Sequence, residues 1–234
     1  MESADGSFVF EHNTSSEFPA ASIIKLFILD YALEKDGRLD DTAAVDDIRP
    51  GDDSMLKFFA GSELTIRSLL SMMIDVSDNT ATNFLIDRYG MSSINAHISA
   101  RGMPHTHLRR RMLDFESRKR GMDNVTSLQD VFRLIKLHIR RESGGAEGGQ
   151  GTMFEELMRL QHDRSRLSLL LPEGITGTKS GSLDDVYSDV GFYAVGGRYS
   201  YAGFLTRGRA VEDARLFIPE LSLLFFNRLA VLPG

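Results

Sequence analysis

The sequence predicts an α+β fold: an antiparallel sheet flanked by helices, with an all-helical domain inserted between the first strand and the later ones. Two patterns carry this prediction. Apolar residues recur at helical spacing through much of residues 20–171, whereas three segments between residues 174 and 206 alternate and are rich in Val, Tyr and Phe between glycines. We therefore expect residues 1–40 and 172–234 to form one discontinuous sheet domain, and residues 41–171 to form the helical domain.

The first strand and the first helix follow from local signals. "SFVFEH", Ser7–His12, is predicted to be a short strand because it is largely apolar and is bounded by Gly6 and a polar run. Pro19 suits the first turn of a helix, so a helix is expected from about Ala20 to Lys35.

The middle of the chain is predicted to be mainly helical. Thr65 has the side chain of an N-cap, and Ser127 with Asp130 resembles a capping arrangement. Residues 103–125 show no clear period and are expected to form a long loop, and the glycine-rich residues 142–151 a flexible connection. The helices expected in this part are residues 66–75, 80–90, 92 to about 102, 131–139 and about 153–171.

The end of the chain supplies the main part of the predicted sheet. "GITGTKSGSL", "VYSDVGFYAV" and "RYSYAGFLT" are predicted to be three strands joined by short turns. The last element, "VEDARLFIPELSLLFFNRLAV", is predicted to be a helix that Pro219 kinks or distorts.

Composition excludes several functional classes. The net charge is −6, with 27 basic and 33 acidic residues, so the basic excess of a nucleic-acid-binding surface is missing. The absence of cysteine excludes disulfides, thiol catalysis and thiolate metal sites. No apolar run approaches the roughly 20 residues of a membrane-spanning helix, so no membrane insertion is expected. No signal peptide is visible, and the expected localisation is periplasmic or extracellular if an export signal has been removed, and otherwise cytoplasmic.

A charged residue stands inside the first predicted helix. "FPAASIIKLFIL", residues 18–29, is almost wholly apolar but contains Lys25, and a buried ammonium group needs a partner or a cleft. Ser22 precedes Lys25 by three residues, which places both side chains on one helix face. A lysine with a lowered pKa can remove the proton of a serine hydroxyl, and a helix N-terminus stabilises a developing anion. Ser-x-x-Lys alone is common, and a lysine that lies along an amphipathic helix is the simpler explanation.

Two further motifs supply context for Ser22 and Lys25. "VSDNT" places Ser77, Asp78 and Asn79 at a junction between helices, where each of them would also serve as an ordinary N-cap. "TGTKSGS" places Lys179 on a predicted strand, shortly before a glycine that lets a ligand approach the backbone closely. A strand lysine before a turn is the plainer explanation of the second motif.

Taken together, and in this order, the three motifs are far more specific than any one of them. With Ser-x-x-Lys, Ser-Asp-Asn and Lys-Ser-Gly the sequence resembles the penicillin-recognising serine hydrolases, and most closely the class A β-lactamases, whose third motif usually reads Lys-Thr-Gly. The resemblance runs from about Gly6 to the final helix. It implies the β-lactamase and transpeptidase fold, a small β-lactam or related acyl substrate, and no metal or organic cofactor.

The resemblance also implies roles for the matching residues. Ser22 would be the nucleophile that becomes acylated, and Lys25 would help to remove its proton. Ser77 would relay a proton to the leaving nitrogen, and Lys179 would raise the positive potential beside it. The residues expected to bind the substrate are Asn79, Ser180, Gly181 and Ser182.

Those four residues would bind different parts of the substrate. Asn79 would hydrogen-bond the amide side chain, and Ser180 would bind the carboxylate. The backbone N–H groups of Ser22 and Ser182 would form the oxyanion hole, in which each donor is typically worth roughly 10²–10³ in rate.

Two departures from the family pattern stand out. In class A enzymes the carboxylate that activates the deacylating water follows an arginine by two residues, and "LRRRMLDFE" has no acid there. Asp114 and Glu116 lie nearby, and each either activates the water or is a solvated loop charge. Relatives also have a helix and a strand before the element predicted at Ser7–His12. If that strand is absent, an exposed sheet edge favours pairing between molecules, and a homodimer is expected.

Alternative functions stay open at this point. One is a penicillin-binding peptidase or esterase on the same scaffold, and another is a sensor or pseudoenzyme that is acylated with little turnover. His105 and His107 could supply two metal ligands, but a metal site needs a third ligand that the sequence does not reveal, and a pair of loop histidines is the simpler explanation.

Overall fold

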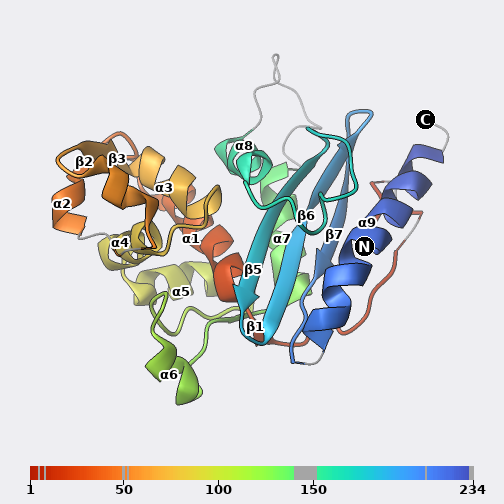
Figure 1. Ribbon diagram of the computed structural model, residues 1–234, viewed down its shortest axis with the longest axis horizontal. Helices are drawn as coiled ribbons and strands as arrows, with labels where there is room; N and C mark the ends of the chain where they lie inside the picture. Colours follow the sequence, from red (N-terminus) through yellow and green to blue (C-terminus); the bar gives the residue numbers. More distant parts are fainter. Residues whose placement is uncertain are drawn as a thin grey trace.

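A three-stranded antiparallel sheet lies between helices in a computed structural model that describes residues 1–231, except residues 5, 8, 49, 50, 52, 140–151 and 209 (Figure 1). Its strands β5 (Thr176–Leu183), β6 (Val186–Val195) and β7 (Arg198–Phe204) lie in chain order, as the alternating segments predict. The mixture of helices with an antiparallel sheet confirms the predicted α+β class.

The remaining elements are helices and short strands, and most of them lie to the left of the sheet in Figure 1. They are β1 (Phe18–Pro19), η1 (Ala21–Ile23), α1 (Ile24–Lys35), β2 (Thr42–Ala44), α2 (Val45–Ile48), η2 (Met55–Phe59), β3 (Glu63–Thr65), α3 (Ile66–Ile74), α4 (Asn79–Tyr89), α5 (Met91–Ala100), α6 (Phe115–Lys119), β4 (Val125–Thr126), α7 (Leu128–Ile139), α8 (Met153–Leu160) and α9 (Ala210–Val231). Within the described ranges, no helix combines the length and the apolar character needed to cross a membrane.

One face of the sheet is covered by α9 (Figure 1). The helix contributes Ile218 and Phe225 to a small core that also contains Tyr193 of β6. The Tyr193 hydroxyl and Ser222 Oγ share a hydrogen bond of 2.7 Å, so the buried polar atoms of this core satisfy each other. The predicted helix is confirmed, and it runs on through Pro219 as a single element.

The other face of the sheet packs against α7 and α8, with α1 behind them in the main core. α1 is buried along most of its length, which explains why its sequence is apolar on nearly every side. The division into a sheet domain and a helical domain stays a prediction, because α8 contacts both β5 and the helices α1 and α3.

Two predicted helix caps are confirmed. Thr65 Oγ1 accepts a hydrogen bond of 3.1 Å from the Ser68 N–H at the start of α3. Ser127 Oγ accepts one of 3.1 Å from the Asp130 N–H at the start of α7. Both hydroxyls satisfy N–H groups that have no partner within the helix.

The predicted strand Ser7–His12 is wrong. The described residues of this range form only an isolated bridge between Val9 and Glu2, beside which Phe10 exchanges two backbone hydrogen bonds with Met1. Glu2 exchanges two backbone hydrogen bonds of 2.8 Å with Tyr201 of β7, so the start of the chain adds a single residue to that edge. The chain turns back at Gly6, which has a φ of 70° and whose N–H donates a hydrogen bond of 3.0 Å to the Ser3 carbonyl.

The helix predicted over Met153–Leu171 is too long, because the observed helix α8 ends at Leu160. Three residues further on, Asp163 Oδ1 accepts hydrogen bonds from the Ser165 N–H (3.0 Å) and the Ser165 hydroxyl, a local arrangement that competes with helical bonding. The loop predicted at residues 103–125 contains α6 and β4, and the flexible connection predicted at residues 142–151 lies outside the described residues.

A buried carboxylate joins three helices behind the sheet. Asp30 of α1 lies 2.9 Å from His97 Nε2 of α5 and 2.8 Å from His138 Nε2 of α7. Arg101 Nε lies 3.1 Å from the same carboxylate. Because a buried charge is tolerated only with partners, this network fixes α1 between α5 and α7.

We expect Asp30→Ala to lower the free energy of unfolding by about 3–5 kcal/mol, because two histidines and an arginine would lose their buried partner. Urea denaturation at neutral pH measures this change. Asp40→Ala is the control, since the Asp40 carboxylate is exposed and pairs with Arg67 at the surface. An equally small change in both variants would show that the Asp30 network does not hold the helices together.

Candidate active site

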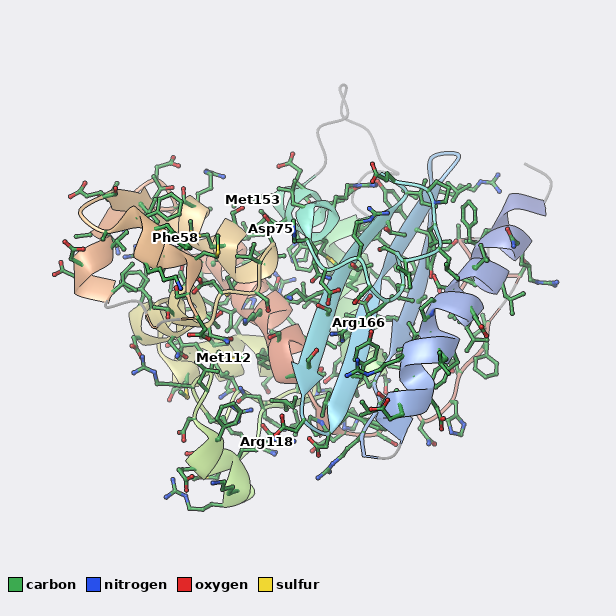
Figure 2. All side chains as sticks on the ribbon, in the orientation of Figure 1. Phe58, Asp75, Met112, Arg118, Met153 and Arg166 are labelled. Carbon is green, nitrogen blue, oxygen red and sulfur yellow. The ribbon has the colours of Figure 1, made fainter. Side chains whose placement is uncertain are left out.

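A cleft of about 400 Å³ opens where η1, the junction of α3 and α4, and the segment 162–166 meet β5. Figure 2 shows Asp75 at the end of α3 and Arg166 against the sheet. The residues that line the cleft are Ser22, Asp75, Val76, Ser77, Asn79, His162, Asp163, Arg166, Lys179, Ser180 and Ser182. The cleft therefore brings together three motifs that lie far apart in the sequence. Lys25, the lysine of the first motif, contacts the second motif through hydrogen bonds.

Ser22 lies on a strained turn at the start of the first helix. It is the middle residue of η1, and the preceding Ala21 has a φ of 45°, an unusual conformation for a residue with a side chain. The Ala20 N–H donates a hydrogen bond of 2.8 Å to the Asn124 carbonyl, which anchors the turn from the other side. Strain of this kind persists only where the surroundings enforce it, and it is common at functional sites.

Gly181 brings β5 close to this turn. A Cβ atom at Gly181 would lie 3.1 Å from the Ala20 carbonyl oxygen, 3.2 Å from Ala21 Cβ and 3.3 Å from Ile23 Cγ1. The sequence suggested that this glycine admits a ligand to the backbone. In the structure its space is taken by the turn that carries Ser22, so the glycine allows the strand and the turn to pack.

Lys25 is fully buried, and its ammonium group has three acceptors. Nζ donates to the Ser77 carbonyl oxygen (2.6 Å), to Ser77 Oγ (3.0 Å) and to Asn79 Oδ1 (3.0 Å). Burial, followed by the nearby charge of Lys179, lowers the pKa of Lys25 well below its ordinary value. The lysine is thus a partner of the second motif and not a surface lysine lying along an amphipathic helix.

The junction between α3 and α4 presents Ser77 and Asn79 to Lys25. Ser77 has a φ of 58°, which turns the chain sharply before α4. Asp78 caps that helix, since its Oδ1 accepts the Ala81 N–H at 2.9 Å, and its carboxylate also accepts the Ser54 hydroxyl. Asp78 is therefore a helix cap, as its residue type suggests, whereas the side chains of Ser77 and Asn79 accept hydrogen bonds from Lys25.

Lys179 approaches the same hydroxyl from the sheet. Its Nζ lies 3.2 Å from Ser77 Oγ, 3.1 Å from Gln161 Oε1 and 3.2 Å from the Ser180 carbonyl oxygen. Burial lowers the pKa of Lys179 to about 8. Ser77 Oγ therefore lies within hydrogen-bond distance of two buried ammonium groups.

This arrangement favours acyl transfer through a serine. Two amines with lowered pKa values flank one hydroxyl, and one of them belongs to the same helical segment as Ser22, so proton transfer to and from the cleft is chemically feasible below the ordinary pKa of lysine. No group of three or more His, Cys, Asp or Glu side chains in the described part of the chain is placed to hold a metal ion.

In the cleft and directly behind it lie side chains that the sequence did not reveal. Gln161 Oε1 accepts the Lys179 ammonium and the Ser180 N–H (2.9 Å), and so fixes the start of the third motif. Arg166 is buried, donates Nη1 to the Gly181 and Ser188 carbonyls and donates Nη2 to Ser182 Oγ. These residues lie just beyond α8, where a continuing helix was predicted, and no motif marks them.

Neither loop carboxylate considered as a water-activating group lines the cleft. Asp114 caps α6 by accepting the Ser117 N–H (3.0 Å) and hydroxyl (2.6 Å). Glu116 is exposed and pairs with Lys119. Both side chains are thus accounted for by local contacts of the loop.

Met112, in the same loop, is held beside α4 by two hydrogen bonds. Its N–H donates to Asn83 Oδ1 (2.8 Å), and its carbonyl accepts from Asn83 Nδ2 (3.1 Å). Asn83 lies one helical turn beyond Asn79, so Met112 is held on the α4 face that carries a ligand of Lys25. Arg110, two residues before Met112, pairs with Asp123 at 2.8 Å and closes the loop.

We expect Gly181→Ala to disturb both the fold and the site, because the added methyl group would push the Ser22 turn away from β5. A loss of about 1–3 kcal/mol in unfolding free energy is expected, together with a displaced Ser22 turn. Thermal unfolding and a crystal structure of the variant measure the two effects. Gly37→Ala is the control, since nothing lies near its Cβ position, and equal behaviour of the two variants would contradict the packing role.

Several known structures share the overall fold of this chain. The beta-lactamase from Sphaerobacter thermophilus DSM 20745 has a TM-score of 0.80 at 25% identity, over 100% of this chain and 91% of that chain. The beta-lactamase from Chitinophaga pinensis DSM 2588 has a TM-score of 0.79 at 20% identity, over 97% and 91%. A mutant of PBP-A in an acyl-enzyme complex with penicillin G has a TM-score of 0.76 at 23% identity, over 95% and 86%.

Sequence comparison assigns nearly the whole chain to one protein family. No curated protein matches the chain. The model of the Beta-lactamase enzyme family, in contrast, matches residues 1–229. The chain is therefore a member of the beta-lactamase enzyme family.

Proposed function

We propose that this protein is a serine hydrolase that opens β-lactam amide bonds through an acyl-serine intermediate, with deacylation as its slow step. One observation carries the proposal: the Lys25 and Lys179 ammonium groups meet at Ser77 Oγ, in a cleft that Ser22 also lines. The fold similarity to a PBP-A mutant whose structure is an acyl-enzyme complex with penicillin G supports the same chemistry.

The proposed acylation uses residues of this cleft only. Neutral Lys25 accepts the Ser22 hydroxyl proton while the serine oxygen attacks the lactam carbonyl carbon. The N–H groups of Ser22 and Ser182 stabilise the oxyanion. When the carbon–nitrogen bond breaks, Ser77 donates its proton to the leaving nitrogen and takes one from the Lys25 ammonium, which restores neutral Lys25.

Hydrolysis of the acyl-serine then needs a base that activates water. Met112 occupies the loop position beside α4, and a thioether cannot accept a proton from water at neutral pH. Asp163 lines the cleft, but its carboxylate is paired with Arg166 (3.4 Å) and hydrogen-bonded to Ser165, which makes it a weak base. Because neither Met112 nor Asp163 supplies this base, we expect a long-lived acyl-enzyme, which favours the penicillin-binding form of the activity over rapid turnover.

The test of this function is to place a carboxylate at Met112. We expect Met112→Glu to speed deacylation of a penicillin adduct by at least ~10-fold, since a positioned general base typically contributes 10²–10⁴-fold. Intact-protein mass spectrometry follows the adduct with time. Met112→Gln is the matched control, because it has a similar size but no basic carboxylate.

Two outcomes would contradict the proposal. Equal deacylation of the Glu and Gln variants would show that Met112 does not lie at the water site. Ser22→Ala should give no adduct, and a penicillin adduct that persists in this variant would exclude Ser22 as the nucleophile.

The pH dependence of acylation tests the base. The rate should rise with pH as Lys25 loses its proton, and the inflection should lie well below 10.5 because burial and the Lys179 charge lower the Lys25 pKa. Lys179→Met removes a like charge, so the Lys25 pKa rises and the inflection should move to higher pH. Lys35→Met, on the exposed end of α1, is the control. An inflection that stays in place, or moves to lower pH, would contradict the coupling between the two lysines.

A further inference from the structure

The sheet side of the cleft contains the groups that would receive a substrate carboxylate. Lys179, Ser180 and Arg166 all line this part of the cavity. Their positive charges and hydroxyl would ordinarily favour an anion. Two carboxylates of the protein, Asp75 and Asp163, line the same cavity.

Asp163 already contacts the groups of this anion site. Its Oδ2 lies 3.4 Å from Arg166 Nη2, and its Oδ1 is held by the Ser165 N–H at 3.0 Å. Although burial disfavours its charge, hydrogen bonds from Ser165, the Arg166 charge and a hydrogen bond from Ser180 hold the pKa of Asp163 below its usual value. Asp163 is therefore an ionised carboxylate in a fixed position.

Most donors of the two cationic groups already have acceptors within the protein, and the remaining Arg166 Nε is buried. Lys179 Nζ has three protein acceptors, one from each of Ser77, Gln161 and Ser180. Arg166 donates Nη1 to two backbone carbonyls, and its Nη2 contacts Ser182 Oγ as well as Asp163.

Asp75, at the end of α3, adds a second carboxylate to this cavity, beside His162, whose N–H donates to the Asp75 carbonyl. Asp75 Oδ1 is buried and has no hydrogen-bond partner among the described residues. The charges of Asp75 and Asp163 thus balance those of Arg166 and Lys179 within this cavity.

We propose that Asp163 occupies the anion site in place of a substrate carboxylate, so that Ser22 is acylated preferentially by acyl donors that are uncharged at this end of the cleft. A donor with a carboxylate there would have to displace Asp163 from Arg166 and Ser180, or bind beside a like charge. This inference rests on the proposed acylation of Ser22, and it makes Asp163 a specificity-determining residue for that reaction.

The test compares one penicillin with its own methyl ester, which differ only in the charge of the carboxylate. The second-order rate of Ser22 acylation is measured for both compounds by intact-protein mass spectrometry of quenched samples. In the wild-type protein we expect the ester to react at least as fast as the acid. In Asp163→Asn we expect the acid-to-ester rate ratio to rise by about tenfold or more, mainly because the acid reacts faster, since removal of a close like charge is worth roughly one factor of ten or greater.

Asn keeps the oxygen that accepts the Ser165 N–H, so the local turn is retained in this variant. Asp163→Ser provides a second, smaller neutral replacement, and thermal unfolding checks that both variants fold. Asp213→Asn is the matched control, because this exposed carboxylate lies on α9 and not in the cleft. Its rate ratio should equal that of the wild type.

The outcomes separate this inference from the proposed function. A ratio that rises in both Asp163 variants but not in Asp213→Asn supports the inference. Adducts that form on Ser22 with an unchanged ratio overturn it and leave the acylation chemistry standing. The absence of a Ser22 adduct with either compound in every folded variant overturns the proposed function, and the inference falls with it.

Discussion

The burial of one ammonium group, that of Lys25, sets the constraint on which the site depends. An isolated buried charge costs several kcal/mol, so this lysine is compatible with the core only if acceptors surround it or its proton is easily lost. Both conditions are met. Three oxygen atoms of Ser77 and Asn79 accept hydrogen bonds from Lys25 Nζ, and burial lowers the pKa of Lys25. The α3–α4 junction must therefore lie against α1, and this same contact brings the second motif to Ser22.

The remaining features of the site hold that contact in place. Positive φ angles at Ala21 and Ser77 aim the two serines, and such strain is kept only by rigid surroundings. Asp78 fixes the junction by capping α4, and Gly181 lets β5 close on the Ser22 turn. Lys179 then reaches Ser77 Oγ from the sheet, which places like charges close together and lowers the pKa of Lys25 further.

Much of the fold and the centre of the site could be predicted from the sequence, because each rests on a local pattern. Strand alternation, helix caps and the three motifs are all visible as short stretches, and their order alone indicates one cleft. The wall formed by Gln161, Asp163 and Arg166 could not be predicted, since a run of residues compatible with a helix hides the Asp163–Ser165 contact that ends α8. The place of Met112 was equally hidden, because three successive arginines precede it and only the Arg110–Asp123 pair and the Asn83 contacts show which one closes the loop.

The most direct measurement of the central claim is the titration of Lys25 itself. NMR of protein labelled with ¹³C at the lysine ε-carbon follows each ammonium group with pH, and Lys25→Met assigns the resonance. A Lys25 midpoint well below the ordinary pKa of lysine, and a further change on loss of the Asn79 acceptor in Asn79→Ala, is the result that the account predicts. A Lys25 resonance that titrates near the ordinary pKa of lysine would contradict it, because the group would then be neither buried as described nor available as a base.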